Sequence, residues 1–279
     1  MVQSDAVATA ELSWLDELTF RVEPPWLAMG TRALHGLPLV VAGGAGSDVL
    51  RRRKEDLLRT VHDEVSVALA GSDVAAHEAA QLVARSAGLQ LDDDRPPLEA
   101  ASLLVPDDLV VLLRLEGGWR MAAGVVCFPS HWWPVEKLGK SVAEIHGPVP
   151  RYSDELRARV DRFLDQLSPC RPVWRRNWTI HASPELYAPH PVGTTMPVPP
   201  ADHWLRSERQ VLASLPGSGG ILFTIRTEQV PLAVLSGRPD VAHRLGRALR
   251  AMPTDLADYR FGALDAGVLA GWLERAGLP

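Results

Sequence analysis

The stretch LVVLLRLEGGWRMAAGVVCF, residues 109–128, determines the class of fold. It contains two apolar runs, Leu109–Leu115 and Trp119–Phe128, with Gly117 and Gly118 between them. Two glycines between apolar runs are typical of a tight hairpin turn. The strands of a hairpin run antiparallel, which argues against a doubly wound parallel sheet. We therefore predict an α+β fold with an antiparallel sheet.

Segments downstream of this hairpin extend the predicted sheet. The strand predicted over Val173–His181 places alternate side chains on opposite faces, with Arg175, Asn177 and Thr179 on one face and Arg176, Trp178 and Ile180 on the other. Residues 221–227 and 230–235 predict a further pair of strands. Between these strand segments we predict a helix over Leu205–Leu215.

Helices are predicted before and after the sheet segments. Apolar residues from Leu50 to Val65 recur at spacings of seven, four and four, which is typical of an amphipathic helix. The basic run Arg51–Lys54 in its first turns is interpreted as a solvated face. Further helices are predicted over 73–86, over 156–167 with Ser153 as cap, and after Val241. The first 45 residues are irregular and predict a wrapping arm.

Composition argues against several classes of protein. The 279 residues include 29 Lys+Arg and 34 Asp+Glu, for a net charge of -5, so we expect no nucleic-acid partner. No run approaches the roughly 18 apolar residues of a membrane span, so we expect no membrane partner. Two cysteines, Cys127 and Cys170, cannot form a disulfide framework. Together with an N-terminus lacking a leader pattern, these features predict a cytoplasmic protein.

Two residues are candidate single ligands for a metal. Six of the nine tryptophans lie between Trp119 and Trp204, and both candidates, Cys127 and His146, fall in that segment. Cys127 ends an apolar strand, where a thiol usually acts as a small buried hydrophobe. His146 lies in the run Ile145–Pro150, whose two prolines and one glycine leave the imidazole few conformers. From the local sequence, both a bond to a carbonyl and ligation of a metal remain open for His146.

Four blocks of this sequence resemble one protein family. They are CFPSHWWPVEKLGK at 127–140 with IHGPVP at 145–150, RRNW at 175–178, RSERQVL at 206–212 and ILFTIRT at 221–227. In this order and spacing they are similar to the haem-dependent oxidative N-demethylases, a family long classed as a domain of unknown function. The N-terminal third resembles the family more loosely.

The resemblance implies a fold and an activity. The implied fold is a PAS-like antiparallel sheet with surrounding helices and an internal haem pocket. The implied domain covers 1–279, with an N-terminal arm and helices at about 1–100, a PAS-like core at about 101–235 and C-terminal helices at about 236–279. The implied activity is oxidation of a small amine at the carbon next to nitrogen, using haem b, O2 and electrons from a separate flavin or iron-sulfur reductase. The alternatives are a haem-binding sensor or carrier without turnover and a haem-free descendant.

The resemblance also implies roles for individual residues. His146 is predicted as the axial iron ligand, with His131, His181 and Cys127 as alternatives. Arg206 and Arg209, three apart on the predicted helix, and Arg175 on its strand are predicted to bind the haem propionates, with internal salt bridges as the alternative. Trp133, Trp178 and Trp204 are expected to line the pocket or fill the core. Glu208 is the predicted catalytic residue, a carboxylate facing the charged amine.

Overall fold

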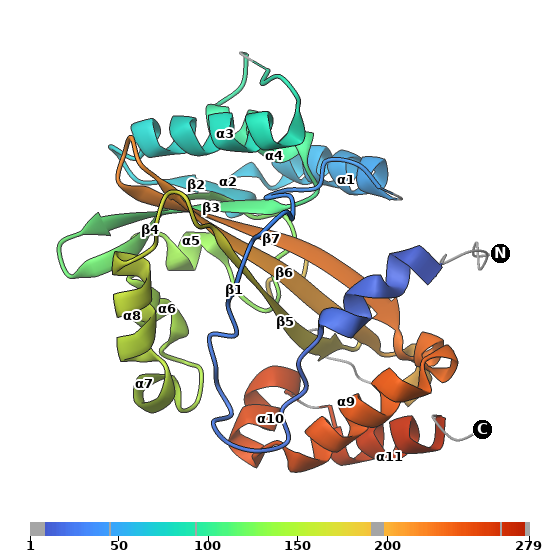
Figure 1. The fold of residues 1–279 in the computed structure, drawn as a ribbon. Coiled ribbons are helices and arrows are strands. Elements are labelled where there is room, and N and C mark those ends of the chain that lie inside the picture. The colour runs from blue at the N-terminus through green and yellow to red at the C-terminus, as the bar shows by residue number, and fades with distance from the viewer. Residues whose placement is uncertain (1–8, 45, 93, 191–197, 263, 277–279) are drawn as a thin grey trace.

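A single open sheet organises the molecule. In the computed structural model, which describes residues 9–44, 46–92, 94–190, 198–262 and 264–276, seven antiparallel strands pair in the order β1-β5-β6-β7-β3-β4-β2 (Figure 1). The strands are β1 (Arg32–Ala33), β2 (Ser66–Ala68), β3 (Asp108–Leu115), β4 (Gly118–Val125), β5 (Val173–His181), β6 (Trp204–Leu215) and β7 (Gly220–Pro231). The predicted α+β class and the antiparallel sheet are confirmed.

Helices lie on both sides of this sheet. In chain order, the helices before β3 are η1 (Thr9–Glu17), α1 (Ser47–Thr60), α2 (His62–Val65), α3 (Asp73–Ala87) and α4 (Pro97–Leu104). Those between β4 and β5 are α5 (Pro134–Lys137), α6 (Val142–His146), α7 (Tyr152–Glu155) and α8 (Arg157–Asp165). Those after β5 are η2 (Pro200–Asp202), η3 (Leu232–Gly237), α9 (Pro239–Ala251), α10 (Thr254–Phe261) and α11 (Ala266–Ala276). None of these helices is long and apolar enough to span a bilayer, among the residues described.

The β3–β4 hairpin forms where its sequence predicts it. Leu115 pairs with Gly118, and Gly117 and Gly118 both have positive φ, at 82° and 119°. A side chain at either position would be strained, which explains the paired glycines. The strand predicted over Val173–His181 is likewise confirmed as β5, with the same bounds.

Two predictions about the next segment are wrong. Residues 205–215 are not a helix but lie in strand β6, which pairs along its length with β5 on one side and β7 on the other. Burial there alternates with a period of two, and cross-strand packing outweighs local helix propensity. The expected strand pair at 221–227 and 230–235 is one long strand, β7, followed by the 3-10 turn η3. The helix predicted over 156–167 is confirmed as α8 over Arg157–Asp165, but the predicted cap is wrong, because Ser153 lies inside the separate short helix α7.

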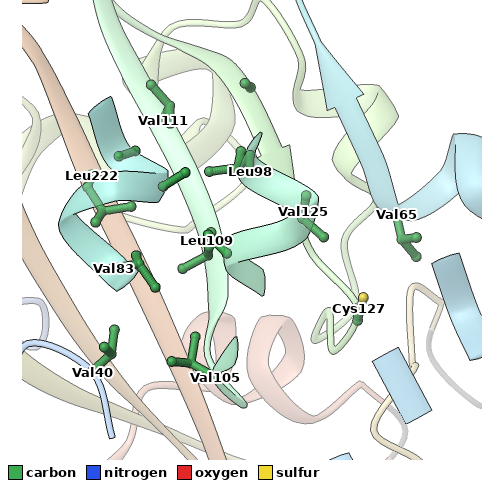
Figure 2. Packing of buried hydrophobic residues seen from close by; sticks show 14 of the residues in the cluster. Val40, Val65, Val83, Leu98, Val105, Leu109, Val111, Val125, Cys127 and Leu222 are labelled. Atoms are coloured by element: carbon green, nitrogen blue, oxygen red, sulfur yellow. The ribbon is translucent and has the colours of Figure 1, made fainter. Parts of the chain in front are cut away.

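One face of the sheet carries a continuous apolar core beneath α1, α3 and α4. Figure 2 shows Val83 and Leu98 from the helices packed over Leu109, Val125 and Leu222 of the strands, with Cys127 in the same cluster. The hairpin residues that point to this face alternate with Val110 and Leu112, which belong to a separate cluster on the opposite face. One face of the sheet is therefore covered by α1, α3 and α4, and the second face packs against a separate apolar cluster.

The interpretation of Arg51–Lys54 as a solvated face fails at Lys54, which is fully buried. Its Nζ donates to the carbonyls of Ser102, Val105 and Asp107 at 3.0, 3.4 and 2.5 Å and lies 3.7 Å from Asp108 Oδ1. This cation therefore joins α1 to the chain entering β3. Burial of a lysine is rare unless it is paired, and here the ammonium has both a carboxylate and three acceptors.

His62 provides a pH-dependent contact between α2 and α4. Its Nδ1 lies 3.1 Å from Asp63 Oδ1 and its Nε2 lies 2.9 Å from Glu99 Oε1. Hydrogen bonds to these two carboxylates raise the pKa of His62 above its ordinary value of 6.5. Since the folded-state pKa is the higher one, protonated His62 stabilises the fold fully below about pH 6.5, and this contribution is lost as pH rises through the folded pKa.

His62→Gln should therefore lower the free energy of unfolding at about pH 5.5 by about 0.2–1 kcal/mol, the range for a half-exposed pair, and have little effect at about pH 9. Urea unfolding at the two pH values measures the difference. An equal loss at both values would show that protonation of His62 makes no contribution.

Candidate functional site

A large cavity lies against the second face of the sheet. It has a volume of about 950 Å³ and is bounded by β5 and β6, by the α6–α8 segment, by α10 and by the N-terminal arm. In Figure 1 the α6–α8 segment and α9–α11 lie at separate places below the sheet, while α3 and α4 cover it from above. This volume is at the upper end of the roughly 300–1,000 Å³ of ligand pockets, so a group much larger than a small amine fits.

The sheet supplies a polar strip along this cavity. Three cross-strand pairs lie in succession, namely Thr179 with Arg206, Asn177 with Glu208, and Arg175 with Gln210, and all six residues line the cavity. They share a face because β5 and β6 are antiparallel with alternating side chains. The predicted grouping of Arg175, Asn177 and Thr179 on one face of the strand is thus the arrangement found.

His146 is the last residue of α6 and borders the cavity. The helix begins at a capping box in which Ser141 Oγ accepts the Glu144 N–H and the Glu144 carboxylate accepts the Ser141 N–H. One turn later, His146 Nδ1 lies 2.8 Å from the Val142 carbonyl oxygen. A carbonyl only accepts, so Nδ1 carries the proton and the Nε2 lone pair is left free in the neutral ring. That tautomer is the one required for ligation through Nε2.

The surroundings of His146 restrict its ring and keep it neutral. The ring stacks on Tyr152, with centroids 4.9 Å apart and planes 14° apart. Burial lowers the pKa of His146, against the opposing effect of the Val142 hydrogen bond. Of the two possibilities left open by the sequence, the bond to a carbonyl is present at Nδ1, and ligation of a metal through Nε2 stays a prediction.

The alternative histidines lie together elsewhere along the cavity. His131 and His181 stack with centroids 4.4 Å apart, and His181 Nε2 lies 3.0 Å from Ser130 Oγ. Burial and the nearby Arg206 charge lower the pKa of His181 to about 3 and also lower that of His131. Each ring is therefore neutral at neutral pH, and His131 has a left-handed φ of 58° that non-glycine residues seldom adopt.

Cys127 does not line the cavity. It is fully buried in the cluster beneath α1, α3 and α4, on the filled side of the sheet. Burial raises the pKa of its thiol to about 12, so the thiolate needed for iron ligation is not available there. Of the four residues predicted as possible ligands, the three histidines reach the cavity.

Arg206 and Arg209 do not share a face. They lie three apart on a strand rather than a helix, so they point to opposite sides of the sheet. Arg206 Nη1 and Nη2 donate to the carbonyls of Leu186 and Phe128 at 3.1 and 2.5 Å, while Arg209 donates to those of Pro38 and Leu39 at 2.6 and 3.3 Å. Both guanidinium groups therefore hold chain segments in place, and Arg209 is outside the cavity.

Arg175 and Arg260 differ from Arg206 and Arg209, because neither of their guanidinium groups makes a hydrogen bond or an ion pair with any described residue. Arg175 Nε is buried without a partner among those residues. Arg260, on α10, lies over the Trp178 ring at 5.2 Å. Burial lowers the pKa of both groups, and the Arg175 charge contributes to lowering that of Arg260 to about 10. Sequence reasoning missed Arg260, because no local motif indicates that α10 packs beside β5.

The remaining predicted residues have different positions. Glu208 borders the cavity and accepts a hydrogen bond of 2.9 Å from Gln210 Nε2. Trp178 borders the cavity and also packs with Trp14, Leu15 and the C-terminal helices, and its Nε1 donates to the Thr19 carbonyl at 3.2 Å. Trp133 and Trp204 are not among the lining residues, whereas Trp132 is.

The comparison with known families matches this part of the chain. The family model described as haem-dependent oxidative N-demethylase, alpha subunit-like, matches residues 80–264. The chain belongs to this family. The match contains the four sequence blocks, the sheet from β3 to β7 and every candidate residue named above. Membership in the haem-dependent oxidative N-demethylase alpha-subunit-like family therefore confirms the resemblance and indicates dependence on haem.

Proposed function

We propose that this protein binds haem in the 950 Å³ cavity and oxidises a small amine at the carbon next to nitrogen, with O2 and external electrons. The observation that carries the proposal is His146, which borders the cavity and whose Nδ1 bonds to a backbone carbonyl while its Nε2 makes no hydrogen bond with any described residue. A family name alone does not specify which residue binds iron. The geometry of His146 supports one answer and the family match supports the chemistry.

The residues of the cavity fit such a group. Haem needs a nitrogen or sulfur ligand, an apolar enclosure and partners for two propionate carboxylates. His146 offers the nitrogen, and Val110, Leu112 and Ile225 offer apolar sheet side chains. Arg175, with a buried Nε that has no described partner, offers a cation on the same cavity. The proposal includes a PAS-like arrangement of the fold around the cavity and haem of type b, as the family resemblance implies.

When bound, haem supplies the O2 and one-electron chemistry that oxidises the carbon next to nitrogen. The protein contributes orientation and exclusion of water. Tyr152 holds the His146 ring by stacking, and the Val142 carbonyl holds its proton at Nδ1. His131 and His181 remain neutral because of burial, so they can exchange hydrogen bonds with substrate without adding charge.

In this proposal Glu208 receives the amine. An alkylammonium group is cationic at neutral pH and binds a carboxylate or an aromatic face. Glu208 borders the cavity between Asn177 and Gln210, so an ammonium there has a carboxylate and two amide oxygens within the same polar strip. Electrons come from a separate reductase, as the family resemblance implies.

The test is to express the protein with a haem precursor and record absorption spectra of the oxidised, reduced and carbon monoxide forms. We expect a stoichiometric Soret band of histidine-ligated type, and release of an aldehyde from small secondary amines when a reductase or peroxide is supplied. Pigment without turnover of any amine tested, with either electron source, would instead support a sensor or carrier. A colourless protein that cannot be reconstituted would contradict haem binding.

A further inference from the structure

We propose that Arg175 and Arg260 form a two-arginine site for carboxylate groups on the wall of the cavity. The inference deepens the proposed function, because it names the residues that recognise the acidic part of the bound group. It does not depend on iron. It rests on two cationic side chains that come from distant parts of the chain and border one cavity.

The two arginines are brought together by the packing of α10 against β5. Thr179 Oγ1 on β5 donates to the Arg260 carbonyl at 3.2 Å, and the Phe261 ring lies 6.0 Å from the Trp178 ring. Arg260 itself lies over that same indole, 5.2 Å from its centroid. These contacts fix the end of α10 beside the strand that carries Arg175.

Neither guanidinium has a carboxylate partner in the described part of the chain. Most other buried or half-buried arginines do have partners. Arg176 pairs with Glu17 and Glu228, both at 2.5 Å, and Arg206 donates to two carbonyls. The Glu208 charge acts on Arg175 without forming an ion pair with it, and the groups that act on Arg260 are Arg175 and Tyr259.

The Arg175 charge contributes to lowering the pKa of Arg260, and two half-buried cations that repel in this way are unfavourable without an anion beside them. A guanidinium recognises a carboxylate through paired N–H donors, which a lysine cannot reproduce. The Trp178 ring under Arg260 restrains that guanidinium, and both residues border the cavity. A carboxylate therefore satisfies the donors of both residues and removes the repulsion.

The carboxylate has two possible sources, a propionate of the porphyrin or an acidic group on the amine substrate. Protoporphyrin IX without iron separates them, since it keeps both propionates but cannot be ligated by His146. We would compare its affinity with that of its dimethyl ester by fluorescence titration. In parallel, calorimetry would compare binding of N-methylglycine with that of dimethylamine.

For the propionate source, we expect the wild type to bind the diacid roughly tenfold to hundredfold more tightly than the ester, as charge-assisted hydrogen bonds indicate. Arg175→Met and Arg260→Met should lose that preference, Arg260→Lys should retain part of it, and His146→Ala should retain all of it. Arg32→Met is the matched control, because Arg32 also borders the cavity but is exposed and lies over Trp174. If the carboxylate belongs to the substrate instead, we expect the wild type to bind the diacid porphyrin and its dimethyl ester equally well. In that case Arg260→Met should lose binding of N-methylglycine.

The inference is overturned if neither comparison changes in Arg175→Met and Arg260→Met while both variants remain folded by circular dichroism. Failure of the proposed function gives a different result. If the protein selects the diacid porphyrin but never ligates iron, the carboxylate site is supported and the proposed haem enzyme is contradicted. If it ligates iron through His146 but shows no preference for the diacid, the proposed enzyme is supported and the carboxylate site is contradicted.

Discussion

His146→Ala should lower the affinity for haem by more than about 100-fold and abolish the histidine-type carbon monoxide spectrum. Loss of a residue that only supports a metal ligand costs roughly 10–100-fold in metal affinity, so loss of the ligand itself should cost more. The reason is structural, since Nδ1 of His146 is bonded to Val142 and Nε2 is the atom that we propose binds iron. Absorption titration of the purified variant measures both effects.

Free imidazole should restore the spectrum of His146→Ala, because it can occupy the space beside Tyr152 that the side chain leaves. His131→Ala and His181→Ala are the matched controls, as both rings border the same cavity. They should keep the Soret band while altering amine turnover. If His146→Ala keeps its affinity for haem and one of these two variants loses it, the iron ligand is His131 or His181 rather than His146.

Lys54→Met should lower the free energy of unfolding by about 3–5 kcal/mol, the cost of breaking a buried ion pair from one side. The ammonium and Asp108 are both fully buried, and the carboxylate also accepts the backbone N–H groups of Cys127 and Phe128 at 2.9 and 2.8 Å. Without Lys54, three carbonyls lose a donor and the carboxylate is left without its cation. Urea unfolding measures the loss.

Arg59→Met is the control for Lys54→Met, since Arg59 is on the same helix but exposed and paired only with Asp56 at 3.3 Å. It should change stability by no more than about 0.5 kcal/mol. Burial raises the pKa of Asp108 above 3.8, so the folded variant takes up the neutralising proton more readily and the defect should shrink as pH falls. A loss as small as that of Arg59→Met would mean that the buried pair has no stabilising role.

Local sequence patterns predicted the elements whose side-chain requirements are themselves local. Gly117 and Gly118 indicated the hairpin because only glycine adopts their backbone angles easily, and Val173–His181 indicated a strand by its alternation. The S-x-x-E pattern at Ser141 and Glu144 was also available and would have indicated that a helix begins after Ser141, shortly before His146. The sequence blocks identified the family, which the family model confirms over residues 80–264.

Predictions failed where a residue's environment depends on distant partners. Residues 205–215 form a strand because β5 and β7 lie on both sides, and this change of period separated Arg206 from Arg209. Lys54 lies in a basic run that looks solvated, yet carbonyls about 50 residues away surround its ammonium. The single-domain extent, the axial ligand and the role of Glu208 remain predictions.

The antiparallel class of the sheet, the hairpin turn and the family could be predicted from the sequence alone, since each depends on residues that are close in the chain or on the order of motifs along it. Which side chains share the cavity depends on how distant segments pack. Arg175 and Arg260 are 85 residues apart in the chain and border the same cavity because α10 packs on β5, whereas Arg209, only three residues from Arg206, faces away. Strand pairing sets the direction of each side chain, and helix packing sets which of them enclose the same space.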